Sequence, residues 1–370
     1  MRYIMVRAAA VLAICVLVLG CLYRPGTVRD IHYQARVDKT ISAANVYPSI
    51  QAALDAAPAA ATEPYRILVA SGDYYEKLVI NKPNIHIVGA GPASTRLYFD
   101  AYAGQSYAQG KTWGTSGSAT LTVRAPGVLL QQLTIENTFD FLANDALAVD
   151  DPARIQHTQA VALLLDTGSD RFIGRQLHLL GYQDTLYINA GRSWFDRSLV
   201  AGNVDYIFGR GNALFTHSEI RTLGRNKTSF PHGYITAPST QISDHYGLTF
   251  IHCKLTRVAG VPDNSVPLGR PWHPTTQFAD GRYADPNAIG KSVFINTWMD
   301  AHITRDGWYS MSGTAKDGIS KVQFTPEDSR FFEYQSAGPG AQVNSKRRQL
   351  SAREAEDYTP EKILGEWYPQ

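Results

Sequence analysis

Two phrases in the middle of the chain, GYQDTLY and GNVDYIFG, each place an acidic residue beside β-branched and aromatic neighbours. Their aspartates, Asp184 and Asp205, are 21 residues apart, which is about one coil of a solenoid. If such coils stack as parallel strands, equivalent positions on neighbouring coils lie about 4.8 Å apart. The two carboxylates would then share one site, where one can serve as an acid while the other stays ionised as a nucleophile.

Two glutamines stand near the first aspartate in this arrangement. Gln183 precedes Asp184, and Gln159 lies 24 residues before Gln183, in the phrase QAVAL. Amide N–H groups are the donors that an ester-cleaving site needs to stabilise an oxyanion, and aspartate can carry an acyl or glycosyl intermediate. The same spacing also fits an internal ladder of Asn, Gln and Asp side chains bonded between coils. Spacing alone leaves both interpretations open.

A further candidate is the phrase LGRPW, which contains Arg270 and Trp272. A guanidinium can hold a carboxylate in a fork, keep it ionised and fix its orientation. The neighbouring indole offers an apolar face against which a sugar ring can stack. A lone Arg-Pro-Trp turn can equally be structural.

The elements around these residues are short strands separated by turns. Residues 47–57 predict one short helix, with Ser49 as its N-terminal cap. Runs such as TIEN, FIHC and FINT follow at intervals near one or two coils, and Ser292 to Asn296 is the last clear strand. The absence of long amphipathic helices disfavours a doubly wound α/β fold, and hairpin patterns typical of a β-sandwich are not prominent. We therefore predict an all-β, right-handed parallel β-helix whose N-terminal end is capped by the short helix.

The C-terminal part changes character from about Phe324, becoming charged and polar before a short predicted helix, EKILGEW. We interpret it as a tail packed along the solenoid rather than as a separate domain. The KRR cluster at 346–348 is read as a solvated turn. The whole chain has 35 basic and 33 acidic residues, and Arg2 and Arg7 lie in its leading segment. The remainder is close to neutral, which disfavours a nucleic-acid binder.

The first 21 residues are predicted to be an export signal, because Arg2 and Arg7 accompany an apolar run too short to span a membrane comfortably. The run ends in VLGC, which resembles a bacterial lipoprotein signal with Cys21 as the lipidated residue. An ordinary signal peptide or an uncleaved anchor is the alternative. Residues 22–40 then form a tether, and residues 41–370 form the catalytic domain. Cys253 would be left as a buried structural thiol without a disulfide partner.

The phrases QAVAL, GYQDTLY, GNVDYIFG and LGRPW, in this order and spacing, resemble the pectin methylesterase (pectinesterase) family, especially its secreted or lipoprotein bacterial branch. The resemblance runs from about Tyr47 to the C-terminus and includes TAPST, GRPWHPTT, GRYADPNAIG and PEDSRFFEY. It implies a parallel β-helix in which Asp205 is the nucleophile and Asp184 the general acid and later base. It further implies that Gln183 and Gln159 donate hydrogen bonds to the oxyanion and that Arg270 pairs with the nucleophile. The substrate cleft would be lined by Trp272, Tyr187, Phe208, Thr275 and Met311.

The family's reaction removes methyl esters from polygalacturonate and releases methanol, with no metal or organic cofactor. The resemblance implies that pectin or its oligomers are the substrate and that Asp184 holds a proton while Arg270 keeps Asp205 ionised. We also expect a monomer. Because Leu22 rather than Asp follows Cys21, analogy with bacterial lipoproteins favours attachment to the outer membrane of a Gram-negative cell, with secretion as the alternative. Two departures stand out: Ser198 and Ser218 occupy positions where some bacterial relatives have cysteines, and Tyr206 replaces the usual phenylalanine.

Three other functions are weighed against this one. A pectin glycoside hydrolase also uses a close carboxylate pair, but it would release reducing ends instead of methanol. A second alternative keeps the fold but acts on other esters or thioesters. A non-catalytic carbohydrate-binding β-helix would be expected to lack one of the two catalytic acids, and neither is missing.

Overall fold

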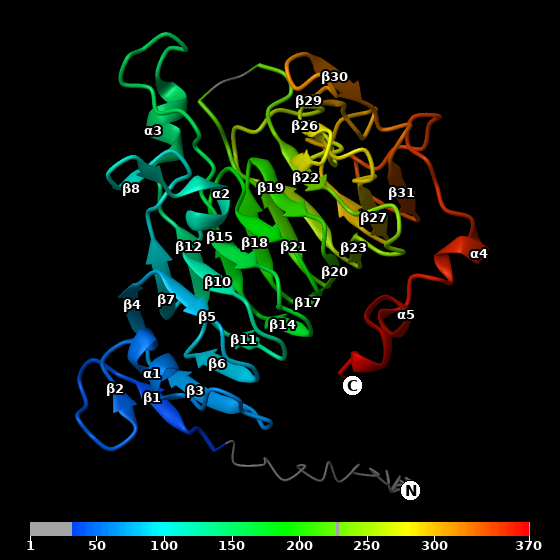
Figure 1. The fold of residues 1–370 in the computed structure, drawn as a ribbon. Helices are drawn as coiled ribbons and strands as arrows, with labels where there is room; N and C mark the ends of the chain where they lie inside the picture. The colour runs from blue at the N-terminus through cyan, green and yellow to red at the C-terminus, as the bar shows by residue number, and fades with distance from the viewer. Residues whose placement is uncertain (1–31, 227–228, 370) are drawn as a thin grey trace, which may run out of the picture. The chain divides into compact units, whose positions relative to one another are not determined.

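The computed structural model describes residues 32–226 and 229–369. The predicted export signal and the predicted lipidation site, Cys21, lie outside these residues. Residues 33 onward form one unit built from short parallel strands that the chain visits in turn, coil after coil (Figure 1). Each full coil places one strand in each of three sheets, so the predicted parallel β-helix is confirmed.

The three sheets run along the solenoid and have eleven, eight and six strands. The eleven-stranded sheet consists of β2 (Val46–Tyr47), β1 (Ala35–Val37), β3 (Tyr65–Val69), β6 (Ile85–Gly89), β11 (Leu129–Gln131), β14 (Phe172–Arg175), β17 (Arg192–Asp196), β20 (Asn212–Thr216), β23 (Leu248–Ile251), β27 (Lys291–Ile295) and β31 (Arg330–Tyr334). The eight-stranded sheet consists of β4 (Gly72–Tyr75), β7 (Thr95–Phe99), β12 (Thr134–Asn137), β15 (His178–Leu180), β18 (Leu199–Gly202), β21 (Glu219–Thr222), β24 (Lys254–Arg257) and β28 (Trp298–Met299). The six-stranded sheet consists of β5 (Leu78–Ile80), β10 (Leu121–Val123), β13 (Leu163–Leu165), β16 (Leu186–Ile188), β19 (Val204–Gly209) and β22 (Tyr234–Pro238).

A column of aromatic rings fixes the register of the central coils. Phe195, Phe215, Phe250 and Phe294 are paired in turn across β17, β20, β23 and β27, and all four are fully buried. Their ring centroids lie 4.8, 4.6 and 4.5 Å apart, with planes within about 10° of parallel. A slip of one residue would turn these rings out of the core, so the column sets which residues of neighbouring coils face each other.

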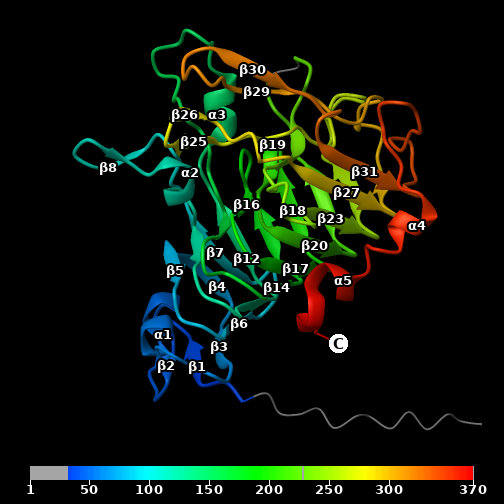
Figure 2. The ribbon, with the colours of Figure 1, turned by 45° about the vertical axis from the view of Figure 1, so that its right-hand side comes forward.

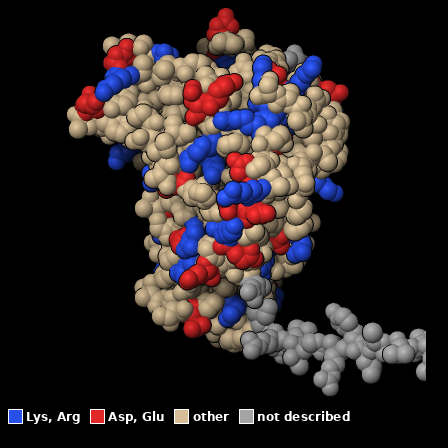
Figure 3. Space-filling view, turned by 90° about the vertical axis from the view of Figure 1, so that its right-hand side faces the viewer, with Lys and Arg blue, Asp and Glu red and all other residues tan. Residues whose placement is uncertain are grey.

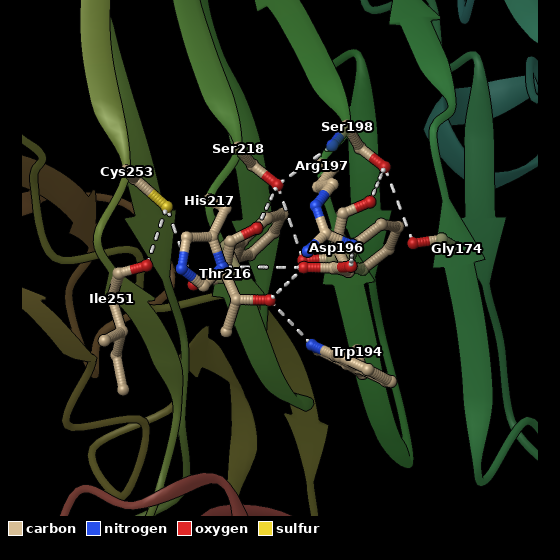
Figure 4. Close-up of polar contacts among 12 residues, drawn as sticks. Gly174, Trp194, Asp196, Arg197, Ser198, Thr216, His217, Ser218, Ile251 and Cys253 are labelled. Carbon is tan, nitrogen blue, oxygen red and sulfur yellow. Dashed lines mark hydrogen bonds and ion pairs between the residues drawn. The ribbon is translucent and has the colours of Figure 1, made fainter. Parts of the chain in front are cut away.

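A second buried row contains Ser198, Ser218 and Cys253 (Figure 4). The Ser218 hydroxyl accepts a hydrogen bond from the backbone N–H of Ser198 at 3.1 Å, and the Ser198 hydroxyl accepts one from Leu177 N–H at 3.1 Å. Cys253 is free and buried, as predicted, and burial raises the pKa of its thiol to about 12. Hydroxyl-to-backbone hydrogen bonds therefore join these coils without a disulfide.

The N-terminal end of the solenoid is closed by α1 (Ile50–Ala56), whose Ile50, Ala53 and Leu54 are buried. The Ser49 hydroxyl accepts from the N–H of Ala52, which confirms the predicted cap. The predicted tether is too long, however, because β1 lies inside residues 22–40 and pairs in parallel with β3. Its three-residue run ARV is too short to stand out in the sequence.

The C-terminal segment packs along the solenoid, as predicted, but it begins later than Phe324 (Figure 2). Strand β31 still belongs to the eleven-stranded sheet, because its Phe331 is buried and the Arg330 guanidinium is bonded to backbone carbonyls, including Gln241 O at 2.8 Å. After it come α4 (Ala352–Ala355), α5 (Pro360–Leu364) and the 3₁₀ turn η1 (Gly365–Trp367). The carbonyls of Ile363 and Leu364 accept hydrogen bonds from Asn212 and Arg192 of the solenoid.

Insertions between the coils build walls on one side of the six-stranded sheet. They are α2 (Gly114–Gly117), α3 (Phe141–Ala146), and three hairpins: β8 (Ser106–Ala108) with β9 (Lys111–Thr112), β25 (Thr275–Phe278) with β26 (Gly281–Ala284), and β29 (Met311–Thr314) with β30 (Lys321–Phe324).

On the face shown in Figure 3, acidic and basic side chains are interspersed, and neither sign forms a broad patch. Within the described part of the chain, every helix is too short or too polar to cross a membrane.

Candidate active site

Asp184 and Asp205 occupy equivalent corners of neighbouring coils. Gln183 pairs with Val204, Asp184 N–H donates to Val204 O at 3.0 Å, and Tyr187 pairs with Phe208. The predicted spacing of one coil is therefore confirmed. Both aspartates have a left-handed backbone, with φ of 65° for Asp184 and 50° for Asp205. Asp184 lies just before β16 of the six-stranded sheet, and Asp205 lies at the bulge in β19. Such conformations are costly for non-glycine residues and persist where the surrounding structure imposes them, often at functional sites.

Arg270 holds Asp205 in a two-point fork. Its Nε donates to Asp205 Oδ1 at 2.9 Å and its Nη2 donates to Oδ2 at 2.5 Å. The guanidinium carbon also lies 3.8 Å from the ring centroid of Tyr234 on β22, so the arginine is held from two sides. Only 10% of the Asp205 side chain is exposed, and the two-point ion pair fixes the orientation of its carboxylate.

Asp184 has the opposite environment. It is 8% exposed, and no side-chain hydrogen bond or ion pair to it is present among the described residues. Burial is the main cause that raises the pKa of its carboxyl well above the ordinary value of 3.8, and the charge of Asp205 raises it further, although Arg270 acts against this. One carboxyl therefore keeps its proton while its neighbour is held in an ion pair, as expected for an acid and a nucleophile.

The two predicted glutamines line the same cavity as the aspartates. The hydroxyl of Thr158 donates to Gln183 Oε1 at 2.8 Å, which engages the carbonyl end of this amide and leaves its NH₂ group for a ligand. The backbone of Gln159 is fixed by a hydrogen bond from Ala103 N–H at 2.8 Å. Thr158 was missed in the sequence, where its only signal is its position next to Gln159.

Three aromatic rings form one wall of the cavity. Tyr187 and Phe208 stack with centroids 4.2 Å apart, and Trp272 meets them edge-on at 6.1 and 5.6 Å. Met311 also lines the cavity, whose volume is about 600 Å³. Thr275 does not line it. Its hydroxyl instead contacts that of Thr314 at 3.3 Å and so joins the two hairpins β25–β26 and β29–β30 beside the cavity.

The structure adds lining residues that sequence reasoning had not assigned. Trp113 stacks on Tyr107 of the β8–β9 hairpin at 4.2 Å and faces the cavity, and Ala237 of the TAPST phrase lies in its floor. Thr115 and Ser116 of α2 also line it. Except for Ala237, these residues lie on an insertion whose position depends on how the coils stack, so spacing could not reveal them.

Tyr206 points away from the cavity into the solenoid. It is fully buried, and its hydroxyl lies 3.1 Å from Thr222 Oγ1, which in turn lies 3.1 Å from His302 Nε2. The Tyr206 hydroxyl therefore makes a hydrogen bond inside the solenoid and is not part of the cavity lining. Within residues 32–226 and 229–369, no group of three or more His, Cys, Asp or Glu side chains is placed to hold a metal ion.

Comparison with known proteins places these features in a family. Residues 39–366 match the family model described as Pectinesterase. The chain is 46% identical over 340 residues to Pectinesterase A of Dickeya dadantii, covering 91% of this chain and 92% of that one. It is 32% identical over 259 residues to Probable pectinesterase 55 of Arabidopsis thaliana, covering 69% and 71% of the two chains.

Solved structures give the same result. A crystal structure of pectin methylesterase in complex with hexasaccharide VII superposes with a TM-score of 0.88 at 45% identity, covering 92% of this chain and 99% of that one. The pectin methylesterase from Yersinia enterocolitica superposes with a TM-score of 0.83 at 47% identity, covering 87% and 100%. The fold and the cavity define a carboxylic ester hydrolase on a parallel β-helix. This chain belongs to the pectinesterase family.

Proposed function

We propose that this enzyme hydrolyses the methyl esters of methyl-galacturonate units in pectin, releasing methanol and leaving free carboxylates on an uncut polymer. The observation that carries the proposal is the pairing of an arginine-bound carboxylate, Asp205, with a buried carboxyl one coil away, Asp184, whose pKa is raised. Support comes from relatives that are themselves named pectinesterases and from a related structure that is described with a hexasaccharide bound.

In the first half of the reaction, Asp205 attacks the ester carbonyl carbon. The carbonyl π electrons move onto oxygen, and the amide groups of Gln183 and Gln159 donate hydrogen bonds to the resulting oxyanion. When the tetrahedral intermediate collapses, the bond to the methoxy oxygen breaks and Asp184 gives its proton to the departing oxygen. Methanol leaves, and the galacturonyl group stays on Asp205 as an anhydride.

In the second half, Asp184 is ionised and acts as a base. It takes a proton from a water molecule whose oxygen attacks the galacturonyl carbonyl carbon. The bond to Asp205 then breaks, which returns this residue as a carboxylate in the Arg270 fork. The product carboxylic acid ionises to solvent, and Asp184 has regained its proton from water, so the enzyme is restored without another reactant.

The aromatic wall supplies the other requirement, a dry surface for a sugar ring and its methyl ester. Trp272, Tyr187 and Phe208 present apolar ring surface beside Asp205, and Met311 continues it. Excluding water there strengthens the charge interactions on which both half-reactions depend.

The rival functions predict different products. A pectin glycoside hydrolase would need one carboxylate free to attack a sugar carbon, and here the Arg270 fork together with two amide donors suits carbonyl chemistry better. Action on other esters or thioesters would keep the same residues and differ only in substrate. A binding protein without activity would not need a proton-holding Asp184.

The test measures methanol and reducing ends released from highly methylated pectin by the chain from Leu22 onward. Wild type is expected to release methanol and no reducing ends, and Asp205→Ala is expected to release neither. Methanol release by the variant equal to wild type would refute the mechanism. Turnover of small esters without turnover of pectin would refute the substrate, and new reducing ends would favour the glycosidase.

We also propose that the enzyme is an exported monomer anchored at Cys21 to the outer membrane, with secretion as the alternative. The basis is the VLGC sequence after an apolar run. In cells given a labelled fatty acid, the full-length protein should take up label that Cys21→Ser abolishes, and membrane fractionation then tests the location. Unlabelled wild-type protein would refute the anchor, and light scattering of the purified chain tests the monomer.

A further inference from the structure

The active-site cavity continues into a second hollow. This hollow has a volume of about 560 Å³ and shares Gly114, Thr115 and Gln159 with the cavity around the two aspartates. Its far wall is the segment after α3, including Arg154, Gln156 and His157. A polymer bound at Asp205 therefore has a path that leaves the site past Gln159 into this hollow.

Arg154 is the cation of the second hollow, and much of its hydrogen-bonding capacity is unused. Its Nη1 donates to the carbonyl of Leu147 at 2.6 Å, which orients the half-buried guanidinium. Among the described residues, no acidic side chain lies within ion-pair distance of it, and no hydrogen bond from its Nε or Nη2 is present. Arg225 and Arg270, by contrast, each hold a buried aspartate in two contacts.

The segment carrying Arg154 is held on both sides. Asn144 of α3 donates to Ile155 O at 3.1 Å and accepts from Ile155 N–H at 2.7 Å. The carbonyl of His157 accepts from Gly104 N–H at 2.9 Å, and a Cβ at Gly104 would lie only 2.4 Å from Gln156 O, so the two backbones can approach this closely only at a glycine. The position of Arg154 is therefore built into the fold.

We infer that Arg154 binds the carboxylate of an already de-esterified galacturonate unit, on the same polymer as the ester at Asp205. The inference rests on the proposed function, since it takes the polymer as substrate. A guanidinium with two free donor groups matches a carboxylate, whereas a methyl ester has no negative charge to offer it. The wall formed by Trp272 and Met311 at the active site is apolar and suits an ester. The groove thus distinguishes acid from ester by position.

The first test compares methanol release from two oligogalacturonides, one fully methylated and one with some free carboxylates. For Arg154→Gln, the ratio of kcat/KM for the partly de-esterified substrate to that for the methylated one should fall roughly tenfold, mainly through KM, because a charged hydrogen bond is lost. Arg154→Lys keeps the charge and should keep most of the preference. The matched control, Arg353→Gln on exposed α4, should retain the wild-type ratio. A ratio in Arg154→Gln equal to wild type would overturn the inference.

The second test separates this inference from the proposed function. Unesterified trigalacturonate has nothing to hydrolyse, so its affinity, measured by calorimetry, does not depend on catalysis. We expect Arg154→Gln to weaken this binding roughly tenfold, Arg154→Lys to weaken it less, and Arg353→Gln to leave it as in wild type. Equal affinity in Arg154→Gln and wild type would overturn the inference even if methanol is released. Absence of methanol from every pectin would refute the proposed function, whatever the affinity.

Discussion

The hydroxyl of Thr158 lies 2.8 Å from Oε1 of Gln183 and donates a hydrogen bond to it. This contact fixes which end of the amide can face a bound ester. Without it, the amide can turn its oxygen toward the developing oxyanion, which would repel it. We therefore expect Thr158→Val to lower kcat about tenfold with little change in KM, which is less than the roughly hundredfold or greater loss on removing an oxyanion-hole donor outright, because the amide itself remains.

The matched control for this prediction is Thr249→Val. Thr249 is buried in β23, its hydroxyl has no hydrogen-bond partner among the described residues, and it is not a lining residue of the cavity. The same loss of a hydroxyl there should leave kcat as in wild type. Steady-state kinetics on methylated pectin measures both variants, and equal kcat for Thr158→Val and wild type would contradict the role of Thr158.

The two-point contact between Arg270 and Asp205 predicts that a positive charge alone at position 270 does not support full activity. Arg270→Lys keeps a cation but cannot donate to both carboxylate oxygens or cover the ring of Tyr234 in the same way. We expect kcat to fall by roughly two orders of magnitude, comparable to removing one group that stabilises charge in a transition state. Circular dichroism controls for folding. A lysine variant with wild-type kcat would show that the two-point contact is unnecessary.

The raised pKa of Asp184 predicts a specific dependence of stability on pH. In the folded enzyme Asp184 stays protonated to a higher pH than its ordinary pKa of 3.8 would allow. Between pH 3.8 and the raised pKa, the folded state therefore binds more protons than the unfolded chain. Its contribution to the free energy of unfolding is therefore favourable at low pH and is lost as pH rises from about 4 toward the raised pKa.

Asp184→Asn removes this ionisation and should abolish activity. Relative to wild type, we expect its free energy of unfolding at pH 7 to be higher by roughly 1–2 kcal/mol, because wild type must either take up a proton at this position on folding or bury a carboxylate, and Asn does neither. At pH 4 the two proteins should be nearly equal. Urea unfolding at both pH values measures the difference, and an advantage of Asn that is the same at both would contradict the assignment.

Because the Tyr206 hydroxyl is buried away from the cavity, we expect its removal to lower the stability of the fold without changing catalysis. Tyr206→Phe removes the hydrogen bond to Thr222, which also contacts His302. The free energy of unfolding should fall by about 1 kcal/mol, the usual net value of such a bond, while kcat and KM stay as in wild type. Denaturant unfolding and pectin kinetics test this. A large loss of kcat would instead mean that the buried network positions Asp205, the preceding residue.

The serine row predicts that a disulfide can be introduced between two coils. Leu199 pairs with Glu219, so Ser198 and Ser218, which precede them, lie on adjacent coils at a separation typical of bridged cysteines. The double variant Ser198→Cys, Ser218→Cys should form this bond under oxidising conditions and raise the free energy of unfolding by roughly 2–4 kcal/mol. Thiol titration and unfolding with and without reductant measure it. A protein that keeps both thiols after oxidation would show that the geometry is unsuitable.

The spacing of Asp184 and Asp205 made their place on neighbouring coils of one cavity predictable, because one coil of a β-helix has an almost constant length in this region. Strand β31 was harder to predict, because an arginine such as Arg330 usually marks an exposed position in a sequence. In the structure its guanidinium donates to backbone carbonyls that earlier parts of the chain supply. Thr158 and Arg154 could not be predicted from periodicity, because they lie in an irregular segment after α3 whose position is set by Asn144 and Gly104. Periodic strands are visible in a sequence, whereas the side-chain contacts of insertions are not.

The nucleophile and its counter-ion are separated by 65 residues, which places the two residues on different coils. During synthesis, the coil with Asp205 can stack on the one with Asp184 before Arg270 has been added to the chain. We expect such a partial chain to hold two neighbouring carboxyl groups without the guanidinium that orients Asp205, so that the nucleophile is not yet fixed for attack. Hydrolytic competence would then appear late in the maturation of the protein, after the polypeptide has passed the position of Arg270.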